Sequence, residues 1–196
     1  MLFALHQSQK HSLRSPLSPN LSPAGGREAS RRNTQNMHTN FRWLILSVIT
    51  IVLDQISKFW VEARLPLYGS EPIIPHFNLV HLQNTGAAFS MFRDSPKLMF
   101  IGLATIVSLG ILSWLFKHRQ GETFTAVGLC LILGGAVGNV IDRVRLGHVT
   151  DFIDFYVGYW HFAAFNVADS AISLGAALLI LDMVLEWKRG GAKAIS

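Results

Sequence analysis

Charged side chains are scarce in this sequence of 196 residues. They make up 15% of the chain, whereas an ordinary soluble domain carries about 25%. Hydrophobic residues account for 50% of the chain, and the mean hydropathy is +0.34. Because each passage of a helix through a bilayer takes about 20 apolar residues, a few such helices would use up the chain. A large soluble catalytic domain is therefore excluded.

The residues of several common sites are also missing. Cys130 is the only cysteine, so no disulfide can form within the chain. The eight His residues form neither an HExxH motif nor another metal-ligand spacing, and no Ser stands in a GxSxG motif. We therefore expect no metal, no other cofactor and no serine nucleophile.

The net charge of +5 is concentrated at one end of the chain. Residues 1–36 contain five Lys or Arg residues and one Glu, whereas the rest is nearly neutral, so we expect no nucleic-acid partner. The same segment is rich in Ser, Pro, Gln and Asn, a composition typical of disorder. We predict a disordered leader over residues 1–36 and a single domain over residues 37–196. Translation is expected to begin at Met37, just before the first apolar segment.

Four apolar segments dominate this domain, and each has about the length of a membrane-spanning helix. Buried helices of a soluble protein are the alternative, but the second segment lacks the polar stripe that they would show. The sequence therefore predicts an all-α membrane protein with four transmembrane helices, at about residues 43–60, 98–116, 124–141 and 162–181.

Basic residues next to these segments predict the topology. Arg42, Lys117 and Lys188 flank the first, second and fourth segments, which places both termini in the cytoplasm by the positive-inside tendency. Residues 61–97 and 142–161 then face outward. The first of them contains β-prone residues and predicts a small β element. The second is crowded with aromatic residues, which favour the membrane interface.

Most of the unusual polar residues lie at the outer ends of the predicted spans. A carboxylate within a span costs about 2.5–3.5 kcal/mol even on a lenient scale and usually serves a function. Asp169 is the clearest case, because it shares one predicted helix face with Asn166, Ser170 and Ser173. We expect this face to look inward, toward either a polar packing seam or a site.

For the other carboxylates, both a structural role and a functional role fit the sequence. Asp54 and Lys58 are one helical turn apart and could form an ion pair, with Lys58 extending outward. Asp142 stands next to Arg143, which favours a structural ion pair. Asp151 and Asp154 lie in the aromatic segment, and their spacing does not decide between them.

Paired carboxylates suggest a chemistry. Two carboxylates at about 4 Å repel by about 4 kcal/mol at an effective dielectric constant of 20, so they share one proton. The ionised member can activate a water, and the protonated member can protonate a peptide carbonyl. The alternative is a small membrane channel or transporter whose carboxylates bind cations.

Five motifs occur in order along the chain and carry a resemblance to a known family. They are Asp54-Gln55-x-x-Lys58, Asn84-Thr85-Gly86-Ala87-Ala88-Phe89-Ser90, Gly138-Asn139-x-x-Asp142-Arg143, Val149-x-Asp151-Phe152 and Phe165-Asn166-x-Ala168-Asp169-Ser170. Over about residues 41–187 the chain closely resembles the bacterial lipoprotein signal peptidases (signal peptidase II).

The resemblance implies a membrane aspartic endopeptidase that removes the signal peptide from diacylglyceryl-modified prolipoproteins, on the amino side of the lipidated cysteine. It assigns the catalytic roles to Asp151 and Asp169, rather than to Asp154 or Asp142. Aromatic residues around Phe152 and Tyr156 are expected to receive acyl chains. The supporting and substrate-binding residues that it implies are Asp54, Lys58, Asn84, Gly86, Asn139, Asp142, Arg143 and Asn166.

The resemblance also implies further structural elements, a cellular location and partners. It is consistent with the predicted extracytoplasmic β element and adds an interfacial helix or loop. The expected location is the bacterial cytoplasmic (inner) membrane, with the active site near its outer face. The expected partners are a lipidated prolipoprotein substrate and membrane lipid, and we expect the protein to act as a monomer.

Overall fold

The computed structural model of the protein describes residues 42–86, 97–117 and 123–193. All of them belong to one compact unit, residues 35–196. The predicted leader and the expected start at Met37 lie outside the described residues.

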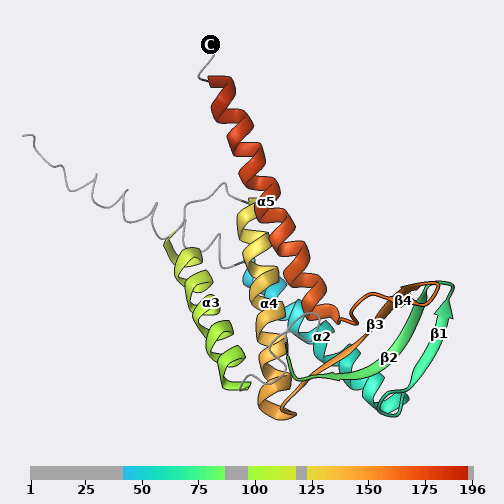
Figure 1. Cartoon of the computed structure of the whole chain (residues 1–196). Helices are drawn as coiled ribbons and strands as arrows, with labels where there is room; N and C mark the ends of the chain where they lie inside the picture. Colours follow the sequence, from blue (N-terminus) through green and yellow to red (C-terminus); the bar gives the residue numbers. More distant parts are fainter. Residues whose placement is uncertain (1–41, 87–96, 118–122, 194–196) are drawn as a thin grey trace, which may run out of the picture. The chain divides into compact units, whose positions relative to one another are not determined.

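The described residues form four long helices, shown in Figure 1. Each is long and apolar enough to cross a membrane. The prediction of four membrane-spanning helices is therefore confirmed, and the protein is a multi-pass membrane protein. The helices are α2 (Leu44–Arg64), α3 (Lys97–Lys117), α4 (Thr123–Arg145) and α5 (Val167–Lys193).

The fourth helix begins five residues later than predicted. Residues 162–166 precede α5, and Phe165 pairs with Ile153 as an isolated β-bridge. The segment from Phe162 onward is apolar throughout, and hydropathy does not distinguish an extended apolar run from a helical one. The error matters because residues 162–165 line the cavity described below.

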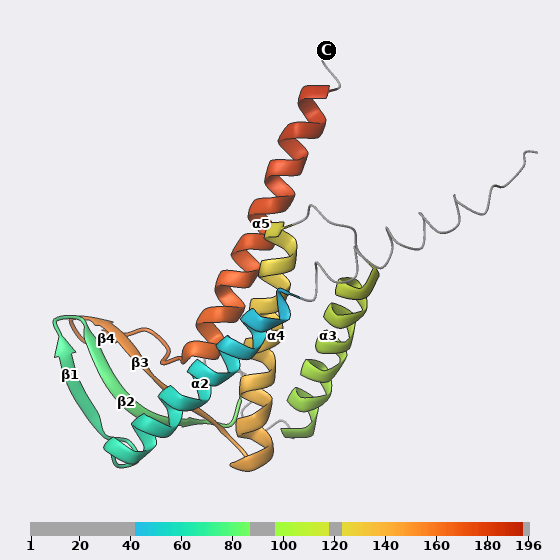
Figure 2. The same cartoon turned by 180° about the vertical axis from the view of Figure 1, so that it is seen from behind.

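Helix α4 packs against α2, α3 and α5, as Figures 1 and 2 show from opposite sides. Its contact with α2 depends on two glycines, Gly134 and Gly138. A Cβ at Gly134 would lie 2.7 Å from Cβ of Thr50, and one at Gly138 would lie 2.7 Å from Oδ2 of Asp54. Small residues at this spacing allow two helices to approach closely, and here they bring Asp54 against α4.

The strands form an antiparallel sheet in the order β1-β2-β3-β4, composed of β1 (Ser70–Ile74), β2 (Phe77–Asn84), β3 (Val149–Val157) and β4 (Trp160–His161). The predicted β element of the first outward segment is confirmed as β1 and β2. The second outward segment was expected to hold an interfacial helix or loop, but its residues 149–157 are strand β3. Its sequence is rich in β-branched and aromatic residues, which suit a strand.

A small core attaches the sheet to the end of α2. Val61, Leu79 and Phe152 are buried together there. Phe152 is 6% exposed and does not line the cavity, so within the aromatic segment around Phe152 and Tyr156 that is expected to receive acyl chains, Phe152 itself is not available for that role. Its ring instead joins the sheet to the helix.

Candidate active site

The register of β3 separates the two aspartates that sequence spacing left open. Successive side chains of a strand point to opposite faces, so Asp151 and Asp154, three residues apart, lie on different faces of the sheet. Asp154 stands opposite Asn78 on β2, whose Nδ2 donates to Oδ2 of Asp154 at 2.9 Å. His161 Nδ1 contacts the same oxygen at 2.9 Å. Asp154 therefore ties three strands together and faces away from Asp151.

Asp151 is held between two asparagines. Nδ2 of Asn84 donates to its Oδ2 at 2.9 Å, and Nδ2 of Asn166 donates to its Oδ1 at 2.8 Å. Asn84 pairs with Val149 across the sheet, so Asp151 is its diagonal neighbour on the same face, within reach of a side chain. A bulge in β2 opposite Phe152, where residues 80 and 81 face a single partner, sets this register.

Asp169 lies in the first turn of α5, and two asparagines contact this residue as well. Nδ2 of Asn139 on α4 donates to its Oδ1 at 2.8 Å, and its own backbone N–H donates to Oδ1 of Asn166 at 2.9 Å. Asn166 thus caps the helix, a preferred role for Asn, while its amide nitrogen contacts Asp151. One side chain therefore links the two aspartates.

The electrostatic environment of Asp151 favours its neutral form. The residue is 3% exposed, and burial together with the charge of Asp169 raises the pKa of Asp151 to about 7, against the opposing hydrogen bonds from Asn84 and Asn166 and the charge of Lys58. Among the described residues, no Lys or Arg forms an ion pair with Asp151 or Asp169.

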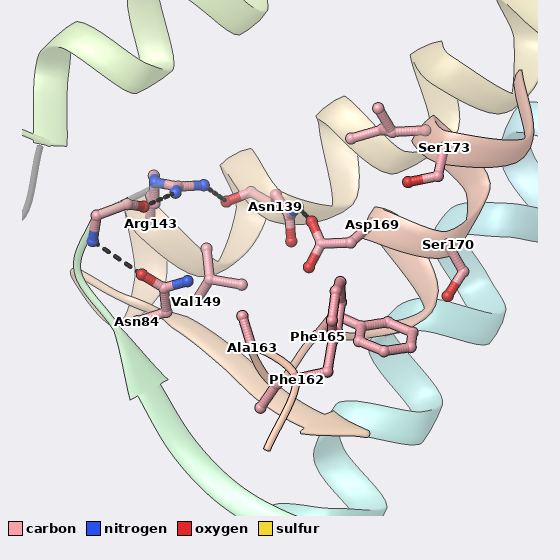
Figure 3. A pocket seen from close by; sticks show the side chains of 13 residues that line it. Asn84, Asn139, Arg143, Val149, Phe162, Ala163, Phe165, Asp169, Ser170 and Ser173 are labelled. Atoms are coloured by element: carbon pink, nitrogen blue, oxygen red, sulfur yellow. Dashed lines mark hydrogen bonds between the residues drawn. The ribbon is translucent and has the colours of Figure 1, made fainter. Parts of the chain in front are cut away.

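A cavity of about 580 Å³ opens beside these residues (Figure 3). Asp169 lines it together with Asn84, Asn139 and Arg143 on one side, and Phe162 and Phe165 also form part of its wall. Ser170 and Ser173 line it as well, so the polar face of α5 looks into this cavity rather than into a packing seam. Asp151 is not among the lining residues and lies directly behind Asn84.

A second polar cluster lies between α2 and α4. Lys58 forms ion pairs with Asp54 and with Asp142, each at 2.8 Å, and all three side chains are at most 3% exposed. Its Nζ also donates to Oδ1 of Asn139 at 3.0 Å. Oδ1 of Asp54 accepts the backbone N–H of Ala168 at 2.9 Å. The cluster thereby fixes both Asn139 and the start of α5.

Two expectations about these charges are corrected. Lys58 does not extend outward, because two buried carboxylates hold it inside. Asp142 pairs with Lys58 and not with the adjacent Arg143, since neighbouring residues on a helix point about 100° apart. Arg143 instead donates to the carbonyl of Gly86 at 2.7 Å and lies over the ring of Phe100, 4.7 Å from its centroid.

The structure therefore brings together the catalytic and supporting residues that the resemblance implies, in two connected clusters, whereas Asp154 and Phe152 lie outside them. It also reveals three polar residues that sequence reasoning missed. Gln55 donates to Oδ1 of Asp142 at 2.9 Å, and Thr150 donates to Oε1 of Glu62 at 2.6 Å. Glu62 follows Asp54 and Lys58 at intervals of four residues, a helical spacing that could have indicated it.

Within the described ranges, no group of three or more His, Cys, Asp or Glu residues could hold a metal ion. Asp151 and Asp169, linked by Asn166 and with Asp169 lining the cavity, are carboxylates that are suited to share one proton.

Comparison with known proteins agrees with this geometry. A sequence model described as Signal peptidase (SPase) II matches residues 46–185. The chain is 46% identical over 140 residues to a lipoprotein signal peptidase of Hydrogenovibrio crunogenus, covering 70% of this chain and 81% of that protein. It is 44% identical over 147 residues to a lipoprotein signal peptidase of Yersinia pseudotuberculosis, covering 74% and 87%.

Two solved structures have a similar fold. One described as a bacterial membrane enzyme, determined by the in meso method at 2.3 Å resolution, has a TM-score of 0.70 and 30% sequence identity, and covers 76% of this chain and 90% of that chain. A second, determined at 1.9 Å resolution, has a TM-score of 0.65 and 31% identity, and covers 72% and 92%. The sequence motifs, the helices and the polar site thus agree with the comparisons, and the chain belongs to the signal peptidase II family.

Proposed function

We propose that this protein is an aspartic endopeptidase of the bacterial inner membrane that removes the signal peptide from diacylglyceryl-modified prolipoproteins, cleaving on the amino side of the lipidated cysteine. Asp151 and Asp169 are the catalytic pair. One observation carries the aspartic mechanism: Asn166 contacts both aspartates, and no described cation pairs with either of them.

The reaction follows from the positions of the two carboxyl groups. With the pKa of Asp151 at about 7, the pair retains one proton near neutral pH. Asp169, which faces the cavity, takes a proton from a water as the water oxygen attacks the scissile carbonyl carbon. Asp151 gives its proton to the carbonyl oxygen. The resulting gem-diol intermediate collapses as the C–N bond breaks: one of its hydroxyl groups returns a proton to Asp151, and the amine nitrogen takes up the proton from Asp169.

Asn84 controls access to Asp151. Its amide contacts Oδ2 of Asp151 and also lines the cavity. The substrate peptide displaces this amide when the carbonyl oxygen approaches Asp151. Asn139 keeps Asp169 in place, and the guanidinium of Arg143 orients the backbone of the substrate.

The cavity also has an apolar side. Phe162, Phe165 and Ile172 form part of its wall, and they are suited to the acyl chains and apolar residues next to the cleaved bond. Phe162 and Phe165 belong to the aromatic segment around Phe152 and Tyr156 that the sequence predicts to receive acyl chains.

The site lies near the outer face of the membrane, and both termini are cytoplasmic. Trp43 and Leu44 at the start of α2 pack in one cluster with Leu115 near the end of α3 and Ala126 near the start of α4. Arg42 and Lys117 therefore lie at the same end of the helices, opposite the sheet, which suits a cytoplasmic side. The protein acts as a monomer, in contact with membrane lipid.

A cleavage assay tests the proposal. Purified protein in detergent is given a lipidated prolipoprotein peptide, and the product is identified by mass spectrometry. Asp151→Asn and Asp169→Asn should each reduce cleavage by at least about a thousandfold while the protein remains folded. Asp154→Asn, on the opposite face of β3, is the matched control and should retain activity.

Substantial turnover by either catalytic variant would refute the assignment of the pair. Inhibition by a chelator, reversed by zinc, would instead indicate a metal mechanism.

A further inference from the structure

Thr150 precedes Asp151 on β3 and is completely buried. Three of its polar groups contact three different parts of the protein. Its hydroxyl donates to Oε1 of Glu62 on α2 at 2.6 Å, and its N–H donates to Oδ2 of Asp142 on α4 at 3.3 Å. Its carbonyl accepts Nδ2 of Asn166, before α5, at 3.3 Å.

We infer that Thr150 is a positioning residue for Asp151 and that Glu62 acts through it. This inference rests on the proposed catalytic role of Asp151. The backbone at residue 150 determines where the next Cα lies, so contacts that fix Thr150 from three sides also fix the start of the Asp151 side chain. Small displacements of a reacting group are costly, because about 1 Å can reduce a rate a hundredfold.

The contact between Glu62 and Thr150 fixes β3 relative to α2, which backbone pairing within the sheet does not do. Strand β3 is paired with β2, but a strand can still shift toward or away from the helices that it covers. The contact between Glu62 and Thr150 joins α2 to β3 one residue from Asp151. Glu62 lies one helical turn beyond Lys58, so the same face of α2 holds both the buried ion pairs and this contact.

The test compares Thr150→Val with a matched variant elsewhere in the protein. Thr125 on α4 also donates its hydroxyl to a carboxylate, that of Asp182 on α5, and neither residue lines the cavity. Thr150→Val should reduce kcat about fivefold to tenfold with KM changed less than about twofold, since the loss lies in the alignment of a reacting group. Thr125→Val should lower the melting temperature similarly and leave kcat unchanged.

Further variants separate positioning from general destabilisation. Thr150→Ser retains the hydroxyl and should recover most of the wild-type kcat. Glu62→Leu should reproduce the effect of Thr150→Val, and it keeps the inference testable if Thr150→Val does not fold. Because both residues act through one hydrogen bond, the double variant Glu62→Leu/Thr150→Val should lose no more activity than Thr150→Val alone.

Two results would overturn the inference: a wild-type kcat in folded Thr150→Val or Glu62→Leu protein, or losses that multiply in the double variant. Asp151→Asn is measured in parallel. If Asp151→Asn is inactive while Thr150→Val is unaffected, only the positioning role fails. If Asp151→Asn remains active, the proposed function itself fails.

Discussion

Asp54 and Asp142 form one pair of buried carboxylates, and Asp151 and Asp169 form another, but among the residues that the structure describes only the first pair shares a cation. Lys58 contacts both Asp54 and Asp142 at 2.8 Å. Asp151 and Asp169 instead accept hydrogen bonds from the neutral amides of Asn84, Asn166 and Asn139. The first pair is therefore suited to hold helices together, whereas the second is suited to share a proton, as the proposed mechanism requires.

The two pairs are connected by hydrogen bonds through single residues. Lys58 donates to Asn139, and Asn139 donates to Asp169. Asp142 accepts the N–H of Thr150, which precedes Asp151. The cluster around Lys58 is thus connected to Asp169 and to Asp151 through one intermediate residue each.

Removing the cation from the first pair should give the largest loss of stability. Lys58→Met leaves Asp54 and Asp142 buried without their partner, and loss of one member of a buried ion pair costs about 3–5 kcal/mol. Lys58→Met/Asp54→Asn should be less destabilised, and Lys58→Met/Asp54→Asn/Asp142→Asn least. Thermal unfolding in detergent measures the series. Equal losses in all three variants would show that the carboxylates do not depend on Lys58.

Asp151 and Asp169 should determine the pH dependence of cleavage. Because burial and the charge of Asp169 raise the pKa of Asp151 to about 7, the proton that Asp151 donates is lost as the pH rises above that value. We expect kcat/KM to fall about tenfold per pH unit above pH 7. Asp154→Asn should show the same profile. A rate that keeps rising from pH 7 to pH 9 would contradict the role of Asp151 as the acid.

The raised pKa of Asp151 also predicts that Asp151→Asn stabilises the protein at high pH, whereas Lys58→Met destabilises it. A carboxyl group whose pKa is raised in the folded state contributes most stability at low pH, and this contribution is lost as the pH rises from about 4 to about 7. Asp151→Asn removes the ionised buried group. It should therefore be about 1–2 kcal/mol more stable than the wild type at pH 8 and show no gain at pH 4. Unfolding curves at the two pH values measure the difference, and an equal change at both would exclude this cause.

A change in an exposed ion pair should have the smallest effect on stability and activity. Arg64 and Glu71 are 2.7 Å apart, with side chains 49% and 36% exposed. Water screens such pairs, and most contribute little. Glu71→Gln should change neither the melting temperature nor the cleavage rate measurably. A clear loss of activity would instead show that the position of β1 relative to α2 matters for the site.

The sequence determined those features that depend on neighbours along the chain. Long apolar segments predicted the four helices, because an apolar run of that length is stable in a membrane only as a helix. A spacing of four residues predicted the pair of Asp54 and Lys58, since such residues share one helix face. The polar face of Asp169, Ser170 and Ser173 followed from the same periodicity. The sequence could also have placed Asp151 and Asp154 on opposite faces, because residues three apart in a strand point to opposite sides once residues 149–157 are predicted to form a strand.

Only the tertiary structure decided which carboxylates meet and which of them receive a cation. Lys58 contacts Asp142 across 84 positions of sequence, and this contact exists because Gly138 lets α2 and α4 approach. Asn84 reaches Asp151 because a bulge in β2 sets the register of the sheet. Contacts of this kind depend on the packing of elements that are far apart in the chain, whereas residue periodicity describes only one element at a time. For this reason the sequence could identify the carboxylates, but only the fold showed which of them are bound by Lys58.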